Sequence, residues 1–362
     1  MINQISKFYK NKKVLITGHT GFKGTWLAIW LKSMGAKICG FSLAPQDTDN
    51  FFDLSGIEKS ILSLTGDIRD FGAINKAVQK FHPDIIFHLA AQALVRESYK
   101  EPVETYSTNI MGTVNLLEAV RLNQKVKAVV NVTSDKCYEN QGWLWGYRES
   151  DPMGGYDPYS SSKGCSELIT SAYMRSFFCS DSDDGNPDTS IASARSGNVI
   201  GGGDFAQNRL IPDIVKAISK KKIIHIRYPH ATRPWQHVLE PLAGYMLLAM
   251  KLFEKGSLFN GPWNFGPRSE DTMEVGYVAD KFASFMGYHK RWAADPEKHP
   301  HEAGLLKLDC SKAQILLGWE TKLNVDKAIE WTANWYKIFL EQSGKLMEVT
   351  DKQIKSYEIL LK

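Results

Sequence analysis

Tyr159 and Lys163 are spaced so that together they could move a proton. Side chains four residues apart on a helix share one face. The preceding Asp157-Pro158 is typical of a helix start, with an N-cap residue followed by proline. Tyr159 would then lie in the first turn, where the helix dipole and the Lys163 ammonium both favour the phenolate form. We therefore expect a phenol of lowered pKa that can act as a general base on an alcohol.

A second group of reactive side chains, Ser134, Asp135 and Lys136, follows the apolar segment Lys127–Val132. That segment predicts a buried strand, and ligands of parallel sheets lie beyond the carboxyl ends of the strands. Ser134 is placed to hydrogen-bond the same hydroxyl as Tyr159. Asp135 and Lys136 supply a further acid and base, which a simple dehydrogenase does not need. A surface turn carrying two charges would have the same sequence, and the residues alone leave that alternative open.

Three glycines, Gly18, Gly21 and Gly24, form the turn GHTGFKG between a predicted strand and a predicted helix. Such a turn lets the backbone approach a pyrophosphate, and the helix N-terminus offers free N–H groups and the positive end of the dipole. We therefore expect a dinucleotide to bind here, and the GxxGxxG spacing favours the short-chain dehydrogenase class. Further candidate cofactor contacts in the same turn are His19, Phe22 and Lys23.

Other candidate cofactor contacts follow later strands. Asp67 comes directly after the third predicted strand, where it could bond an adenine amino group or cap a helix, and Ile68 is its neighbour. Leu89, Ala90 and Ala91 lie at the end of the fourth predicted strand. The second predicted strand ends without the acid that would bind the ribose 2′-hydroxyl of NAD, and no arginine follows it to bind a 2′-phosphate. The residues alone therefore leave NAD and NADP open.

These reactive residues belong to a chain whose first half alternates predicted strands and helices. The predicted strands are 13–17, 37–41, 62–65, 84–90 and 127–132, and the predicted helices between them are 25–34, 70–81 and 112–123. This alternation predicts an α/β fold with a Rossmann-type doubly wound parallel sheet. We expect residues 1–198 to form the cofactor-binding Rossmann domain. We expect residues 199–362 to form mainly a smaller mixed C-terminal lobe for the substrate, with some segments returning to the first domain.

Composition argues against several classes of protein. Of the 362 residues, 43% are hydrophobic and 23% are charged, which is typical of a globular enzyme rather than a disordered or fibrous chain. The formal net charge of +4 argues against a dedicated nucleic-acid binder. We see neither a signal segment nor an apolar run long enough to span a membrane, so we expect a cytoplasmic protein. Five scattered cysteines without CxxC spacing favour free thiols over a disulfide framework or a metal site.

The chain resembles the extended short-chain dehydrogenase/reductase superfamily in the glycine turn, His88–Gln92, Thr133–Tyr138, Tyr159 with Lys163, and Ser196–Val199. Within that superfamily it is most similar to the nucleotide-sugar 4,6-dehydratases, from Lys13 to Trp319. The discriminating segments are GHTGFKG, TSDKCYEN and RPWQHVLEP. In relatives that act on dTDP-glucose, the catalytic strand is followed by an Asp-Glu pair. The Asp135-Lys136 pair resembles instead the branch that acts on CDP-glucose.

The resemblance implies NAD as the cofactor and CDP-glucose as the substrate of a dehydration. Tyr159 would take the proton of the C4 hydroxyl as C4 is oxidised, with Lys163 beside it and Ser134 on the same hydroxyl. Asp135 would protonate the leaving C6 hydroxyl, and Lys136 would remove the C5 proton. Because only a neutral lysine is a base, another carboxylate or a water chain could take that last role. Return of the hydrogen to C6 and of a proton to C5 would give CDP-4-keto-6-deoxyglucose.

The resemblance also implies where the substrate binds. Asn198 lies where the superfamily holds the diphosphate, and Arg233 in RPWQHV resembles its nucleotide-binding arginine. Arg268 is a candidate by its position alone. Its guanidinium fork would suit phosphate oxygens. Four further candidates are Leu210 and Ile211, expected against the base, and Arg96 and Ser98, expected near the sugar.

Relatives pair through two helices per subunit, which by resemblance are the helices near Val103–Asn123 and Tyr159–Phe178. We therefore expect a homodimer or homotetramer. Two other functions stay open. One is a 4-epimerase, or a dehydratase for a dTDP-, GDP- or UDP-sugar, and the other is an inactive nucleotide-binding protein on the same fold. The presence of Ser134, Tyr159 and Lys163 together argues against the inactive protein.

Overall fold

The computed structural model describes residues 1–45, 49–178, 188–290, 292–297, 305–341 and 343–362. The surface loop expected at Ser180–Ser190 lies mostly outside these ranges, and so does Cys179. The other four cysteines, Cys39, Cys137, Cys165 and Cys310, are free thiols. Within the described ranges, no helix is both long enough and apolar enough to cross a bilayer.

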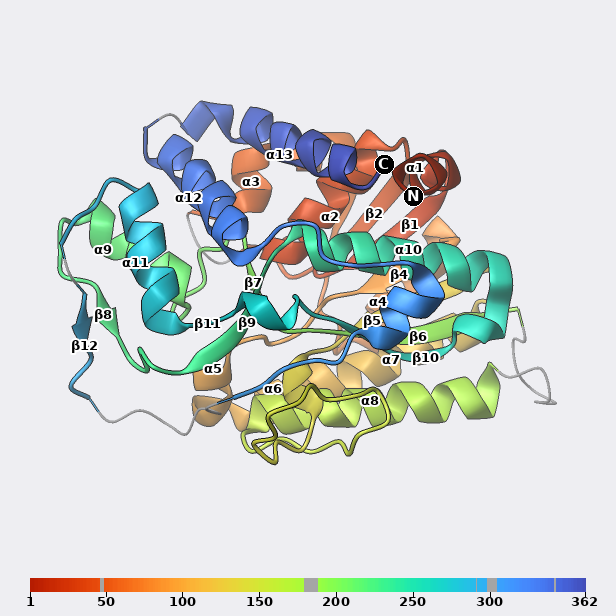
Figure 1. The fold of residues 1–362 in the computed structure, drawn as a ribbon. Coiled ribbons are helices and arrows are strands. Elements are labelled where there is room, and N and C mark those ends of the chain that lie inside the picture. Colours follow the sequence, from red (N-terminus) through yellow and green to blue (C-terminus); the bar gives the residue numbers. More distant parts are fainter. Residues whose placement is uncertain (46–48, 179–187, 291, 298–304, 342) are drawn as a thin grey trace.

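A seven-stranded sheet forms the centre of the molecule, with the strand order β10-β6-β5-β4-β1-β2-β3 (Figure 1). All neighbouring strands in it are parallel, which confirms the predicted Rossmann-type sheet. In order along the sheet, the strands are β10 (Gly261–Phe265), β6 (Ser190–Ser196), β5 (Ala128–Val132), β4 (Ile85–His88), β1 (Lys13–Thr17), β2 (Lys37–Ser42) and β3 (Leu62–Thr65).

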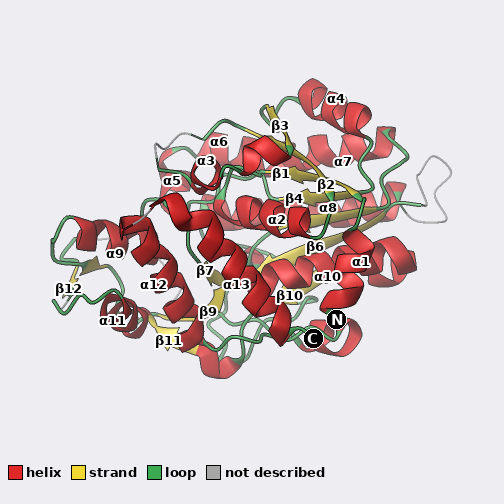
Figure 2. Cartoon of the chain, turned by 90° about the horizontal axis from the view of Figure 1, so that it is seen from above, coloured by secondary structure: helices red, strands yellow, loops and turns green. Residues whose placement is uncertain are grey.

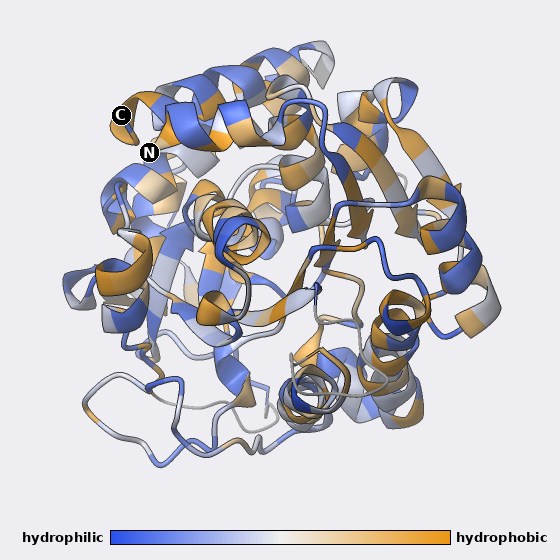
Figure 3. Ribbon diagram, turned by 90° about the vertical axis from the view of Figure 1, so that its right-hand side faces the viewer, coloured by the Kyte–Doolittle hydropathy of each residue, from blue (hydrophilic) through white to orange (hydrophobic). Residues whose placement is uncertain are grey.

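Helices cover both faces of this sheet because its strands send alternate side chains to opposite sides. In β1, Val14 and Ile16 join the apolar core on one face, and Leu15 joins the core on the other. Figure 3 shows apolar and polar residues side by side along the helices, as expected where only one side of a helix faces a core. The first face carries α2 (Phe22–Ser33) and α10 (Leu239–Lys255), and the second carries α4 (Phe71–Phe81), α7 (Gly112–Leu122) and α8 (Pro158–Phe177).

A smaller group of elements lies to one side of the sheet in two perpendicular views (Figures 1 and 2). It contains α9 (Leu210–Ser219), α11 (Val275–Phe285), and the paired strands β8 (His225–Ile226) and β12 (Ala293–Ala294). A three-stranded sheet adjoins it, with β7 (Asn198–Ile200), β9 (Thr232–His237) and β11 (Thr272–Glu274). The segments β10 and α10 pack with the main sheet although they follow residue 198. The boundary at residue 198 stays a prediction.

The two ends of the chain lie together, because the Ile2 N–H donates to the Leu361 carbonyl at 3.4 Å (Figure 1). The helix α13 crosses above the sheet near α2, and the Trp30 indole donates to Glu358 at 2.9 Å. The remaining helices are α1 (Ile2–Tyr9), α3 (Phe51–Ser55), α5 (Val95–Lys100), α6 (Pro102–Tyr106), α12 (Val325–Glu341) and α13 (Leu346–Leu360).

Several predicted boundaries differ from the structure by one to three residues, and two differences bear on the site. Helix α2 begins at Phe22 rather than Thr25, because Gly21 is its N-cap residue and the glycine turn runs directly into the helix. The helix predicted at Gly112 continues a π-helical turn at Ser107–Met111. That turn holds Asn109 against α8, where its amide donates to the Ser162 hydroxyl at 2.8 Å.

Candidate active site

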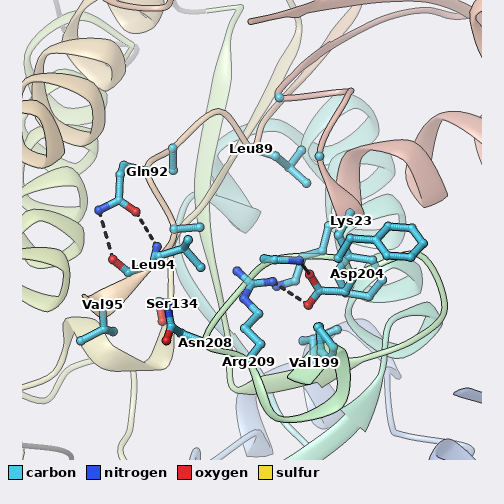
Figure 4. A pocket seen from close by; sticks show the side chains of 18 of the residues that line it. Lys23, Leu89, Gln92, Leu94, Val95, Ser134, Val199, Asp204, Asn208 and Arg209 are labelled. Atoms are coloured by element: carbon cyan, nitrogen blue, oxygen red, sulfur yellow. Dashed lines mark hydrogen bonds and ion pairs between the residues drawn. The ribbon is translucent and has the colours of Figure 1, made fainter. Parts of the chain in front are cut away.

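A cavity of about 780 Å³ opens where the C-terminal lobe faces the carboxyl ends of the central strands (Figure 4). Residues that follow β1, β4, β5 and β6 line one side of it. Residues of α9 and of β8 with its following turn line the other. This is the edge at which parallel α/β sheets bind their ligands.

The glycine turn forms a wall of this cavity and has no room for side chains at two of its positions. Gly18 has a φ of +73°, and a Cβ there would lie 2.7 Å from the Ala90 nitrogen. A Cβ at Gly24 would lie 2.2 Å from the Gly18 oxygen. A Cβ at Gly21 would lie 3.4 Å from its nearest neighbour, the Gly18 oxygen, so the protein leaves space there. The turn therefore brings bare backbone and the start of α2 to the cavity.

His19 is not among the residues that line the cavity, and its role as a cofactor contact stays a prediction. Its side chain is buried beneath the turn, where Nε2 lies 2.8 Å from the Ser63 hydroxyl and the ring meets Phe52 edge-on. Burial lowers the pKa of His19 to about 4. Its neutral ring therefore packs the turn against β2 and β3.

Lys23 and Phe22 line the cavity, as do the other predicted cofactor residues Asp67, Ile68, Leu89, Ala90 and Ala91. The Lys23 ammonium donates to the Ser196 hydroxyl at 2.8 Å, and burial lowers its pKa to about 7. Asp67 forms an ion pair with Arg69 at 2.5 Å, and this hydrogen-bonded partner lowers the pKa of the carboxyl. Asp67 is therefore an ionised acceptor at the cavity edge.

Tyr159 lies in the first turn of α8, as the sequence predicts. The side chain of Asp157 accepts the Ser160 N–H at 2.9 Å, and Pro158 follows it as the first helical residue. The phenol is buried, and its burial raises the pKa to about 12. The expected lowering is therefore wrong for this structure, because the cost of burying a phenolate outweighs the hydrogen bond with Ser134 and the nearby charge of Arg209.

Lys163 is one helical turn from Tyr159 and is also buried. Its ammonium donates to the Val132 carbonyl at 3.3 Å, at the end of β5. Burial lowers its pKa to about 8, and the Glu167 carboxylate opposes that shift. Helix α8 and strand β5 thus meet at this lysine.

Ser134, Asp135 and Lys136 follow β5 and line the same cavity as Tyr159. The Ser134 hydroxyl donates to Asp135 Oδ1 at 3.0 Å. Asp135 is 3% exposed, and its Oδ2 has no hydrogen-bond partner among the described residues. Burial raises the pKa of this carboxyl, while the charge of Lys136 opposes the shift. The turn is therefore no exposed surface turn, and its burial shifts the pKa of the Asp135 carboxyl upward.

Most of the predicted substrate residues line the cavity. They are Arg96, Asn198, Leu210, Ile211 and Arg233. Arg96 reaches across the opening, where its guanidinium donates to the Asn208 side chain at 3.0 Å. Helix α5, which carries Arg96, is thereby joined to the segment just before α9.

Ser98 and Arg268 lie outside the cavity lining, and their roles as substrate contacts stay predictions. Ser98 is fully buried in α5, and its hydroxyl donates to the Val95 carbonyl at 2.7 Å. Arg268 donates to the Thr321 carbonyl at 3.2 Å and lies 3.7 Å from Glu270. Its position after β10 turns it toward the C-terminal segments.

Sequence reasoning missed Arg209, which lies near the middle of the cavity (Figure 4). Its guanidinium pairs with Asp204 at 2.8 Å, and its charge acts on both Tyr159 and Lys23. The turn that carries it has no helical or strand periodicity to mark it. The available signal was its place directly before Leu210 and Ile211, which were predicted to line the site.

The cavity thus combines a phenol, a carboxyl and amines with several arginines. Tyr159, Asp135 and Lys136 can exchange protons with neighbouring atoms of one small ligand. Arg209 and Arg233 can neutralise phosphate oxygens of the same ligand. The bare backbone of the glycine turn can approach a second phosphate-bearing molecule.

A family model described as GDP-mannose 4,6 dehydratase matches residues 15–332. The chain belongs to this family. A CDP-glucose 4,6-dehydratase from Salmonella typhimurium is 48% identical over 97% of this chain and 97% of the relative. A probable dTDP-glucose 4,6-dehydratase from Sinorhizobium fredii is 25% identical over 90% of this chain and 92% of the relative. The GDP-mannose 4,6 dehydratase family match therefore covers the sheet, the cavity and most of the C-terminal lobe.

Solved structures share the fold of this family member at lower identity. UDP-glucose 4-epimerase from Thermotoga maritima, with UDP-glucose, has a TM-score of 0.78 at 21% identity, and the match covers 91% of this chain and 100% of that chain. The dTDP-glucose 4,6-dehydratase from Bacillus anthracis in complex with NAD has a TM-score of 0.74 at 22% identity, covering 91% and 98%. At these identities the likeness concerns the fold alone.

Proposed function

We propose that this protein is a CDP-glucose 4,6-dehydratase that uses NAD and forms CDP-4-keto-6-deoxyglucose. The observation that carries the proposal is the placement of Tyr159, Asp135 and Lys136 in one cavity, because dehydration needs an acid and a base besides the oxidising pair. The 48% identity to the Salmonella typhimurium dehydratase, over nearly all of both chains, supports CDP-glucose as the substrate.

The glycine turn fits a dinucleotide cofactor. At Gly18 and Gly24 the backbone is packed too closely for side chains, and at Gly21 free space adjoins the start of α2. A pyrophosphate could use that space and the free N–H groups of the helix start. NAD bound there would supply the acceptor for the hydride of C4 and the donor of the hydride for C6.

Tyr159 receives the proton of the C4 hydroxyl in the oxidation step. Ser134 hydrogen-bonds the phenol and is close enough to orient the same sugar hydroxyl. Nearby positive charge makes it easier for a buried phenol to lose its proton, and Arg209 supplies such a charge. Lys163 is held at the end of β5, one turn along α8 from the phenol.

Asp135 and Lys136 carry the loss of water. The C4 ketone makes the C5 hydrogen acidic, and Lys136 in its neutral form removes that proton. Asp135 gives its proton to the C6 oxygen as the C6–O bond breaks, and water leaves. Hydrogen returned to C6 and a proton returned to C5 complete the product, so the net change is the loss of one water from CDP-glucose. The raised pKa of Asp135 suits a proton donor.

The nucleotide would lie along the wall formed by α9 and by β8 with its following turn. Asn198, Arg209 and Arg233 are placed to bind the diphosphate, and Leu210 with Ile211 would contact the base. Arginine forks suit phosphate oxygens in such a partly buried site.

The proposed homodimer or homotetramer would form through α6, α7 and α8. These helices expose apolar side chains at Val103, Met111, Leu122 and Leu168, which a second copy could cover. Light scattering of the purified protein would report the number of copies directly, and a monomer at micromolar concentration would contradict this arrangement.

Incubation with NAD and CDP-glucose tests the proposed function, with dTDP-, UDP- and GDP-glucose in parallel. A 4-keto sugar absorbs in alkali, so CDP-glucose should give the strongest absorbance and a 6-deoxy signal by NMR. A 4-epimerase would give CDP-galactose without that absorbance. A faster reaction with another nucleotide sugar would contradict the proposed substrate, and the absence of any product would contradict the enzyme.

A further inference from the structure

A buried ion pair joins α8 to β6 next to the turn that carries Ser134, Asp135 and Lys136. Glu167 and Arg195 have side chains only 5% and 3% exposed. Arg195 Nη2 donates to Glu167 Oε2 at 2.9 Å, and Nε donates to Oε1 at 3.0 Å. A two-pronged contact of this kind fixes the relative orientation of the two elements.

This ion pair is bonded to both ends of the segment Thr133–Tyr138. At the first end, the Thr133 hydroxyl donates to Glu167 Oε1. At the second end, Arg195 Nη1 donates to the Tyr138 hydroxyl at 2.6 Å, and the guanidinium lies 4.7 Å from the centre of the Tyr138 ring. Ser134, Asp135 and Lys136 lie between these two attachments.

The same ion pair is tied to the oxidising residues. Glu167 lies one helical turn after Lys163 on α8, and its charge acts on the Lys163 ammonium. Lys163 in turn bonds the Val132 carbonyl just before the segment. Movement of the segment against α8 would therefore break contacts at both of its ends.

Burying two charges is costly, and apolar replacements of buried ion pairs are often as stable. Stability alone is therefore a poor explanation for this pair. Besides its bonds to Ser193 and to the Glu149 carbonyl, the pair is bonded to both ends of the segment that the proposed elimination uses.

We propose that Glu167 and Arg195 are positioning residues that hold Asp135 and Lys136 at a fixed distance from Tyr159 and Lys163. This inference rests on the proposed function, because it assigns the pair to the coupling of C4 oxidation with water loss. Neither positioning residue touches the sugar. Loosening the segment should slow water loss more than oxidation, since Tyr159 and Lys163 keep their places on α8.

Tyr138→Phe is the main test, because it removes the hydrogen bonds of the Tyr138 hydroxyl with Arg195 and Asn264 without changing any charge. Single turnovers with NAD and CDP-glucose give the oxidation rate from the absorbance of reduced nicotinamide. Exchange of the C5 hydrogen in D₂O and formation of the 6-deoxy product give the elimination rate. We expect oxidation within about threefold of the wild-type rate and elimination slowed about tenfold or more, since small displacements of catalytic groups have effects of that size.

Glu167→Gln is the second variant, and Glu330→Gln is its matched control. Glu330 belongs to an exposed pair with Lys327 on α12, so its neutralisation should leave both rates unchanged. Glu167→Gln should also shift the ratio of the two rates toward oxidation. If it fails to fold, Tyr138→Phe still decides the matter.

Equal loss of both rates in Tyr138→Phe would overturn the inference, and so would two unchanged rates. Failure of the proposed function has a different signature, because the wild-type protein would then form no 6-deoxy product from CDP-glucose.

Discussion

At the scale of single residues, burial raises the pKa of both Asp135 and Tyr159. A raised pKa suits the carboxyl to donating a proton, whereas it makes the phenol harder to deprotonate. The positive charge of Arg209 beside Tyr159 assists that deprotonation.

We predict that Tyr159→Phe removes the oxidation step. The ring keeps its packing, but the oxygen that receives the C4 proton is gone, so turnover should fall about a hundredfold to ten-thousandfold. Steady-state product formation and single-turnover oxidation should fall together, with an unchanged melting temperature as the control for folding. Wild-type rates would remove the phenol from the mechanism.

We predict a different defect for Lys136→Ala. Oxidation at C4 should continue, because Tyr159 and Lys163 are intact, whereas exchange of the C5 hydrogen with D₂O should nearly cease. NMR of the recovered sugar measures that exchange. If C5 exchanges at the wild-type rate in this variant, another group or a water chain is the base.

The reactive residues themselves could be predicted from spacing, but their protonation could not. The pattern of Tyr159 and Lys163 is visible in the sequence, and so is the N-cap at Asp157. The raised pKa of Tyr159 depends on burial in the folded protein, and the opposing charge of Arg209 comes from a segment distant in sequence. Spacing along one helix contains no information about that burial.

At the scale of elements, two glycines of the glycine turn have different roles. Gly24 is needed for packing, and Gly21 is expected to matter for cofactor binding. A Cβ at Gly24 would meet backbone atoms, so Gly24→Ala should lower the free energy of unfolding by about 1–3 kcal/mol. Gly21→Ala meets no close protein atom and should keep the wild-type melting temperature. The added methyl group would fill the space proposed for the pyrophosphate. The affinity of the Gly21→Ala variant for NAD should therefore fall about tenfold or more.

Calorimetric titration with NAD and thermal melting of both variants check this prediction. A Gly21→Ala variant that binds NAD as tightly as the wild type would place the pyrophosphate elsewhere.

Elements with strong local signals were the predictable ones. The strand at Lys13–Thr17 has the predicted bounds, and α8 begins at the predicted proline. The two-residue strand β8 has a weaker local signal, because its pairing depends on β12, a distant segment. The buried position of His19 is not visible in the sequence for a related reason, since it follows from contact with Ser63 on β3.

At the scale of the whole molecule, Glu240 joins α10 to the C-terminal part of the chain. It accepts the Tyr357 hydroxyl of α13 at 2.5 Å and the Leu323 N–H at 2.7 Å. Burial raises its pKa from an ordinary 4.5 to about 7. Between these values the unfolded chain has lost this proton while the folded chain keeps it, so rising pH favours unfolding.

We predict that Glu240→Gln removes this part of the pH dependence. The free energy of unfolding of the wild type should fall relative to the variant as the pH rises from about 5 to about 7. Urea unfolding at several pH values measures both proteins, with Glu330→Gln as an exposed control. Parallel curves for wild type and Glu240→Gln would show that Glu240 does not keep its proton in the folded protein.

The central claim is that one cavity oxidises C4 and eliminates water across C5 and C6 of the same hexose. CDP-glucose carrying deuterium at C4 tests it most directly, with NMR of the product after reaction with NAD in ordinary water. The account predicts deuterium at C6 of CDP-4-keto-6-deoxyglucose, because the hydrogen taken from C4 returns to C6. Deuterium retained at C4 of an epimerised sugar, or lost to solvent, would contradict it.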